Sequence, residues 1–148
     1  MIFFFKMCKN LDRFPSEVFV SQFVWYHLVM GITNVRLTVK NPFDLTKKVE
    51  EQFLVDTGAH YTVLPSHIVK KLNLKPSFEQ EFSLADGKVI KRKIGGAVVR
   101  FQGRELPITV VLGEKGDSAL LGVTTLENFG MMIDPFKRKL YHSKLMLG

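Results

Sequence analysis

The stretch that most constrains the fold of this chain covers residues 53–65 and reads FLVDTGAHYTVLP. One apolar run leads into a Thr-Gly turn that carries Asp56, and a second apolar run leaves it. Strands that are apolar on both faces are buried, so we expect Asp56 at the end of a buried strand. A carboxylate in that position is costly unless it is hydrogen-bonded or paired.

Two neighbours of Asp56 are suited to holding its carboxylate. Gly58 lacks a Cβ, which lets the backbone pass close by with its amide pointing at the carboxylate. Thr57 offers a hydroxyl that bonds locally or across to a neighbour. A buried acid held in this way indicates a functional role. The alternative is a structural Asx-turn between two strands.

A second stretch, residues 119–134, reads ALLGVTTLENFGMMID. It consists of an apolar pair that ends in glycine, a short helix-like segment and a last strand. Together with the Asp-Thr-Gly-Ala stretch it resembles the retropepsin-like aspartic proteases, the single-domain relatives of retroviral protease. The resemblance covers roughly residues 32–141, and within the group the chain looks most like the small cellular and prokaryotic members.

The rest of the chain reads as short strands and turns. Alternating residues 35–39, a turn at 41–44 and a strand at 47–56 form a hairpin that delivers Asp56. After Pro65, residues 66–72 have room for one or two helical turns, with Ser66 as N-cap. Gly95-Gly96 is expected to break the strand that begins at residue 89. Residues 97–101 and 105–112 then form another hairpin. The pattern predicts a mostly β fold, a small closed β-barrel of the acid-protease (retropepsin) type with one short C-terminal helix.

A further hairpin is predicted where strand-like residues 78–84 and 89–94 flank a turn with an Asp-Gly pair. In the resembled family this hairpin is the flap, which folds over the substrate. The resemblance therefore implies substrate binding by Ala59, Ala85, Asp86, Gly87 and Lys88. The alternative is an ordinary surface hairpin.

Length, cysteine content and the N-terminal segment limit the domain organisation. The 148 residues suffice for one domain, predicted over residues 30–148, where regular strand alternation begins. Residues 1–29 are predicted to be an N-terminal extension outside the catalytic fold, with a packed helix or strand or a peripheral segment as alternatives. The single Cys8 excludes an intrachain disulfide and a Cys-rich zinc site, and it fits a reducing, cytoplasmic location.

The net charge of +7 raises the question of an acidic partner. Residues 88–104 contain six basic side chains and no acidic one, but apolar residues alternate with them as in a strand. We interpret this run as the solvated face of a hairpin, and no nucleic-acid partner is expected.

The apolar residues 18–30 are too short to span a bilayer, so no membrane partner is expected. The histidines lack metal-ligand spacing, so neither a metal nor another cofactor is expected.

Aspartic proteolysis needs two carboxylates that share one proton. This chain has one Asp-Thr-Gly, and Asp86, Asp117 and Asp134 lack its buried-strand setting. The economical solution is a homodimer in which Asp56 of each chain meets at the two-fold axis. The resemblance implies that Thr57 of each chain hydrogen-bonds across that axis.

The sequence therefore predicts an aspartic endopeptidase that hydrolyses polypeptides, with Asp56, Thr57 and Gly58 as catalytic residues. Viral relatives commonly tie the dimer with an acidic residue and an arginine at the positions of His60 and Val123, and this ion pair is missing here. Two alternatives stay open. One is a non-proteolytic protein- or peptide-binding module on the same fold, and the other is a nucleic-acid-associated protein.

Overall fold

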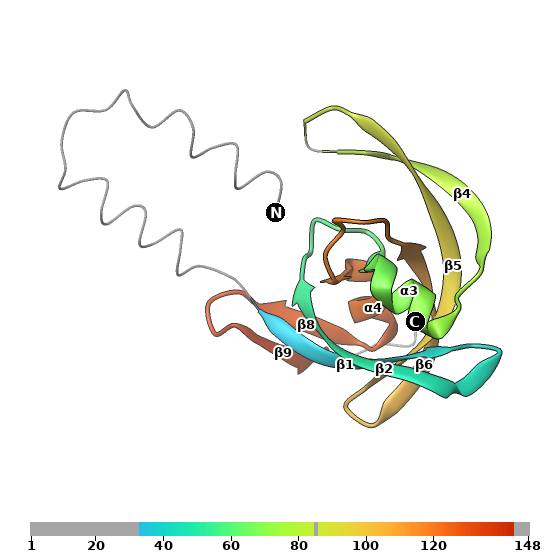
Figure 1. The fold of residues 1–148 in the computed structure, drawn as a ribbon. Coiled ribbons are helices and arrows are strands. Elements are labelled where there is room, and N and C mark those ends of the chain that lie inside the picture. Colours follow the sequence, from blue (N-terminus) through green and yellow to red (C-terminus); the bar gives the residue numbers. More distant parts are fainter. Residues whose placement is uncertain (1–32, 85, 144–148) are drawn as a thin grey trace, which may run out of the picture.

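The computed structural model of the protein describes residues 33–84 and 86–143, and most of these residues lie in strands (Figure 1). Residues 1–29, predicted as an extension, lie outside the described part, so the predicted domain boundary stays a prediction. The elements follow one another as β1 (Asn34–Asn41), β2 (Asp44–Val55), β3 (Thr62–Leu64), α3 (Ser66–Leu72), β4 (Pro76–Ser83), β5 (Val89–Phe101), β6 (Arg104–Leu112), β7 (Leu120–Leu121), α4 (Val123–Asn128), β8 (Met131–Asp134) and β9 (Lys139–His142).

The main sheet has the strand order β1-β2-β7-β3-β6-β5-β4, and β8 pairs with β9 in a separate two-stranded sheet. Strand β1 also pairs with β5 where Thr38 lies opposite Arg100 and Lys40 opposite Val98, so β1 has neighbours on both edges. The predicted mostly β fold is confirmed. Full closure of the sheet into a barrel stays a prediction.

The first hairpin forms because its residues alternate between core and solvent. Leu37 and Val39 are buried in β1, while Thr38 between them and Lys40 after them are more exposed. The predicted turn lies between Asn41 and Asp44, so β2 begins at Asp44 rather than at Lys47. Asn41 is buried, and its side-chain amide donates to the Leu72 carbonyl over 2.8 Å. This bond joins the hairpin end to α3.

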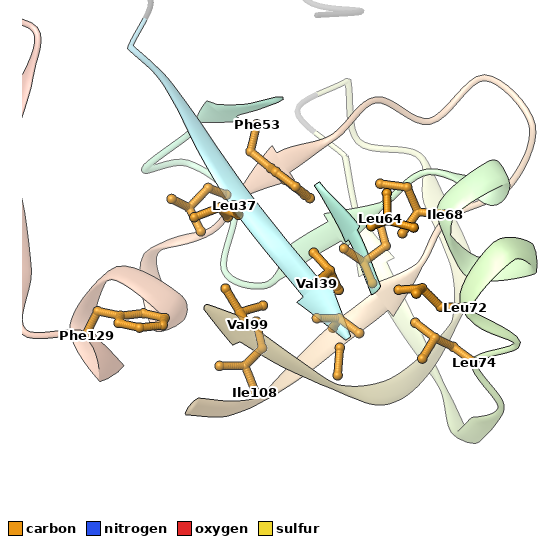
Figure 2. Packing of buried hydrophobic residues seen from close by; sticks show 14 of the residues in the cluster. Leu37, Val39, Phe53, Leu64, Ile68, Leu72, Leu74, Val99, Ile108 and Phe129 are labelled. Carbon is orange, nitrogen blue, oxygen red and sulfur yellow. The ribbon is translucent and has the colours of Figure 1, made fainter. Parts of the chain in front are cut away.

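One cluster of apolar side chains forms the core (Figure 2). It draws on β1, β2, β5, β6 and both helices, and burying each large side chain contributes roughly 1.5–3 kcal/mol. The last three residues of β2 pass directly beside this core, which fixes the strand that leads to Asp56. The buried members are Leu37, Val39, Val49, Phe53, Val55, Leu64, Ile68, Leu72, Leu74, Ala97, Val99, Ile108, Val110, Leu112, Leu121, Leu126, Phe129 and Met131.

Both helices are short, and both were expected from the sequence. The prediction that Ser66 caps α3 is wrong, because Pro65 occupies the N-cap position and Ser66 is already helical. Pro65 has a φ of −57°, and because proline carries no polar side-chain atom, no side-chain cap is made. The helix ends at Asn73, which adopts the left-handed conformation with φ of 51°.

The predicted strand break at Gly95-Gly96 is also wrong. Strand β5 runs without interruption from Val89 to Phe101, and both glycines stay in register with β6. A Cβ on Gly95 would lie 2.8 Å from the carbonyl oxygen of Lys75, so the absent side chain permits a close approach of two backbone segments. The face that is buried changes here, from Ile94 on one side of the sheet to Ala97 on the other.

Neither a membrane-spanning helix nor a metal-binding group of side chains occurs in the described residues. No helix in residues 33–84 and 86–143 is long and apolar enough to cross a membrane. Over the same ranges, no three or more His, Cys, Asp or Glu side chains are grouped so that they could hold a metal ion.

Candidate active site

Asp56 follows directly after the last residue of β2 and is fixed through its backbone. Strand β7 runs parallel to the end of β2, with Leu121 opposite Val55. The Asp56 amide donates to the Leu121 carbonyl over 3.0 Å, and the Val55 amide donates to the Thr33 carbonyl over 2.8 Å. The Leu-Leu-Gly segment therefore supports the strand that carries Asp56.

The carboxylate of Asp56 accepts a hydrogen bond from the Gly58 amide, with 2.9 Å between N and Oδ1. This is the bond that the sequence predicted. A Cβ on Gly58 would lie 3.2 Å from the same oxygen, so a side chain here would press on the carboxylate. As predicted, Asp56 lies at the end of a buried strand, directly after the buried Val55, and in the single chain it is half-buried.

The other predicted residues of this loop follow Asp56 directly in the chain. Thr57 and Gly58 are exposed, and Ala59 is half-buried. The Ala59 amide donates to the Asp56 carbonyl over 3.2 Å, which closes the turn. The predicted contact of Thr57 across a two-fold axis needs a second chain and stays a prediction.

The start of α4 holds the far side of the loop. The Val123 amide donates to the Ala59 carbonyl over 2.9 Å. The His60 carbonyl accepts two bonds from Thr124, at 3.2 Å from the amide and 2.7 Å from the hydroxyl. The viral ion pair is missing at His60 and Val123, but the segments around these two residues are joined by hydrogen bonds to the carbonyls of Ala59 and His60.

A buried pair of threonines beneath the loop was missed by the sequence analysis. Thr62 and Thr125 are both almost fully buried, and their hydroxyl oxygens lie 2.8 Å apart. The Gly122 amide donates to the Thr62 hydroxyl over 3.1 Å. Buried polar groups need partners of this kind. Thr62 between apolar neighbours in a core strand was the available signal, but nothing local points to Thr125.

The predicted substrate-binding residues of the hairpin lie at the tip between β4 and β5. Ala85 lies outside the described residues, while Asp86, Gly87 and Lys88 are exposed. The Lys88 amide donates to the Asp86 carboxylate over 3.1 Å, and Gly87 has a φ of 82° that favours glycine. The predicted Asp-Gly hairpin is confirmed.

An aromatic contact, not predicted from the sequence, links this hairpin to the Asp56 loop. The ring of Tyr61 packs edge-on against the ring of Phe82 on β4, with 6.2 Å between centroids. Tyr61 in turn contacts the His60 ring at 4.6 Å. The underside of the hairpin therefore lies against the segment that follows Ala59.

Comparison with known proteins identifies the family. The protein-family model described as "gag-polyprotein putative aspartyl protease" matches residues 46–128, which is more than half of the chain. The chain belongs to this aspartyl protease family. The resemblance inferred from Asp-Thr-Gly-Ala and Leu-Leu-Gly is thereby confirmed.

Solved structures agree on the fold of this aspartyl protease family member. The EIAV protease in complex with the inhibitor HBY-793 matches with a TM-score of 0.50 and 16% identity, covering 78% of this chain and 93% of that one. The foamy viral protease-reverse transcriptase in complex with an RNA/DNA hybrid has the same TM-score, identity and coverage of this chain, but only 13% of that chain is covered. These two likenesses show a retropepsin-like fold.

A retropepsin-like aspartic protease from Rickettsia conorii is also similar, with a TM-score of 0.49 and 23% identity over 72% of this chain and 83% of that one. No curated protein matches the sequence.

Two of the chain's other aspartates are engaged in local structure. Asp117 pairs with Arg92, with 3.1 Å between Nε and Oδ2. Asp134 accepts bonds from the amides of Lys137 and Phe136, and these amides, Lys137 first, hold the pKa of Asp134 below its ordinary value. Neither carboxylate lies in an Asp-Thr-Gly turn.

Proposed function

We propose that this protein is an aspartic endopeptidase that hydrolyses peptide bonds as a homodimer, with Asp56 of each chain forming the catalytic dyad. The observation that carries the proposal is the position of the Asp56 carboxylate. It lies at the end of β2, whose backbone is hydrogen-bonded to β7, and the Gly58 amide donates to it over 2.9 Å. Membership of the aspartyl protease family supports the same conclusion.

In the proposed reaction the two Asp56 carboxyl groups share one proton at a separation of about 3 Å. The ionised group acts as the base that activates a water, and the protonated group polarises the scissile carbonyl. The Gly58 amide fixes one oxygen of each carboxylate, and the exposed Thr57 is available to the partner chain. Two chains are needed because each supplies one Asp-Thr-Gly.

The β4–β5 hairpin is proposed to act as the flap over a polypeptide substrate. Its underside contacts Tyr61, three residues beyond Gly58, so a peptide bound at Asp56 would lie beneath the hairpin. Asp86, Gly87 and Lys88 at the tip and Ala59 in the loop are the proposed substrate contacts. The mechanism uses no metal or organic cofactor, and the proposed location is cytoplasmic.

A peptide-library cleavage assay between about pH 3 and pH 7 tests the proposal, since the shared proton requires a partly protonated dyad. The wild type is expected to cleave, and Asp56→Asn is expected to lose activity by at least about 10²–10⁴-fold. The fold should persist, because the Asn oxygen still accepts the Gly58 bond. Undiminished cleavage by Asp56→Asn overturns the proposal.

Mixing the two proteins tests the dimer. Excess Asp56→Asn added to wild type should suppress cleavage, because mixed dimers hold one competent carboxylate. HBY-793, which is bound to the EIAV protease, serves as a probe and is expected to inhibit. Peptide binding without cleavage at every pH would instead favour the non-proteolytic binding module.

A further inference from the structure

The β4–β5 hairpin extends beyond the strand that supports it. Strand β6 ends at Leu112, which lies opposite Lys93 of β5. Beyond this point β5 pairs with β4 alone, starting from Arg92 opposite Gln80. We call residues 80–84 and 86–92 the arm, and Figure 1 shows it curving away from the other strands.

The arm has two different faces, because side chains alternate along a strand. Phe82, Ile90 and Arg92 share one face and are half-buried, and this is the face that contacts Tyr61. Glu81 and Lys91 share the opposite face and are exposed. The half-buried face therefore lies toward the body of the protein.

Arg92, at the base of the arm, makes a two-pronged ion pair with Asp117. Its Nε lies 3.1 Å from one carboxylate oxygen and its Nη2 lies 3.4 Å from the other. Glu114 adds a second negative charge 3.5 Å from Nη1. The side chains of Arg92 and Asp117 are only 19% and 27% exposed, so solvent screens the pair less than a surface pair.

Asp117 is itself fixed in the body. One of its oxygens accepts the Glu114 amide over 2.8 Å, and the Asp117 amide donates to the Glu114 carbonyl over 3.1 Å. The chain then continues from this turn into β7, where the Leu121 carbonyl accepts the Asp56 amide. One short segment thus connects the base of the arm to the strand beside Asp56.

We propose that the Arg92–Asp117 ion pair is a latch that holds the arm over the Asp56 loop, which makes Arg92 a positioning residue for substrate. The proposal rests on the proposed function of Asp56 as the catalytic acid. Apart from this ion pair, the described contact that ties the arm to the body near Asp56 is the ring contact of Tyr61 and Phe82, a single edge-on contact. Loss of the latch therefore leaves the arm free to move away from the body of the protein.

The chain offers a matched control in the same hairpin. Lys91 and Glu81 form an ion pair of 3.3 Å whose side chains are 71% and 62% exposed. This pair joins β4 to β5 within the arm and makes no link to the body. Lys91→Gln removes a positive charge one residue from Arg92 without touching the latch.

Arm position is measured by the distance between two spin labels, one on Ser83→Cys near the tip and one on Lys70→Cys in α3, both exposed. Cys8→Ser in the background keeps the labels at these two sites, and excess unlabelled protein removes distances between copies. In the wild type a single dominant distance is expected. In Arg92→Gln the population with the arm swung out should rise about tenfold, the size of effect that such couplings give.

Two further variants complete the test. Asp117→Asn should behave like Arg92→Gln, and Lys91→Gln should match the wild type. With peptide substrate, Arg92→Gln should raise KM about tenfold and leave kcat within about twofold, the pattern of lost substrate binding.

An unchanged distance in Arg92→Gln, or an equal change in Lys91→Gln, overturns the latch. A changed distance with unchanged KM overturns the positioning role of Arg92. If the wild type cleaves no peptide, the proposed function fails, and the distance measurement still decides whether the latch exists.

Discussion

The Asp56 loop and the β4–β5 arm are held in opposite ways. Backbone groups fix the loop on both sides, through Leu121 before the turn and through Val123 after it. Side chains fix the arm, through the Arg92–Asp117 pair and the Tyr61 ring contact. The proposed catalysis needs a fixed carboxylate, whereas the proposed flap must move to admit substrate, and the two modes of attachment match these needs.

The difference has a consequence for mutation. Backbone hydrogen bonds survive most side-chain changes, so the loop is sensitive mainly where a new atom would push the backbone apart. The arm is sensitive where one side chain is removed.

Gly122→Ala is expected to disturb the loop most. The added Cβ would lie 2.4 Å from the carbonyl carbon of Tyr61 and 2.8 Å from the Thr62 nitrogen, and these backbone atoms cannot rotate away. Relief requires moving β3 away from α4, at a cost of about 3 kcal/mol in the free energy of unfolding. Urea denaturation measures this value.

The control is Gly96→Ala on β5, where nothing lies within 4 Å of the added Cβ. Its unfolding free energy should stay within about 0.5 kcal/mol of the wild type. Equal stability of Gly122→Ala and Gly96→Ala would contradict the close packing of the loop against α4.

Thr62→Val is expected to cost about 1–2 kcal/mol. The substitution keeps the shape but leaves the Thr125 hydroxyl and the Gly122 amide without their buried partner. Adding Thr125→Val removes one of the two orphaned groups, so the double variant should lose less than the sum of the single losses. Chemical denaturation of the four proteins gives the coupling, and strict additivity would argue against the hydroxyl pair.

Gly87→Ala at the arm tip is expected to cost about 1 kcal/mol. Nothing lies within 4 Å of the added Cβ, so the cost comes from the φ of 82° alone. Gly87→Asn should cost less, because asparagine tolerates positive φ better than alanine. Thermal unfolding of both variants provides the comparison. A loss as large as that of Gly122→Ala would mean that the tip is packed as tightly as the loop.

Features of the site that depend on neighbours in sequence were predictable. The Gly58 amide and the Asp56 carboxylate are two residues apart, so the turn itself brings them together. The Asp-Gly hairpin tip at Asp86 and Gly87 followed from local turn chemistry in the same way. The pairing of Leu121 with the Asp56 strand was not predictable in this way, because a two-residue strand has no signal of its own.

Features that depend on distant segments were not predictable. Gly95 was read as a strand break, whereas its role is to let the Lys75 carbonyl approach, 20 residues earlier in the chain. Thr125 bonds to a residue 63 positions away, and Arg92 bonds to one 25 positions away. A hydroxyl or a guanidinium in the sequence shows that a partner is needed but does not show which one.

The smallest effect is expected from an exposed ion pair on the body. The Glu51 carboxylate accepts the Gln52 amide over 3.1 Å and lies 3.3 Å from the His67 ring, and these bonds, Gln52 first, hold the pKa of Glu51 below its ordinary value. Because the folded pKa is lowered, the stabilisation is present above the unfolded pKa of about 4.3 and is lost as pH falls through the folded value.

The contribution of the Glu51–His67 pair to the free energy of unfolding is small because both side chains are exposed to solvent. The His67 and Glu51 side chains are 65% and 37% exposed, so the pair should be worth less than about 0.5 kcal/mol. Unfolding free energies of wild type and Glu51→Gln should differ by this amount near pH 6 and converge near about pH 3. Arg92→Gln, in contrast, should shift the arm at neutral pH. If Lys91→Gln, which removes the same positive charge as Arg92→Gln, moved the arm equally, net charge rather than the half-buried position of Arg92 would govern the arm.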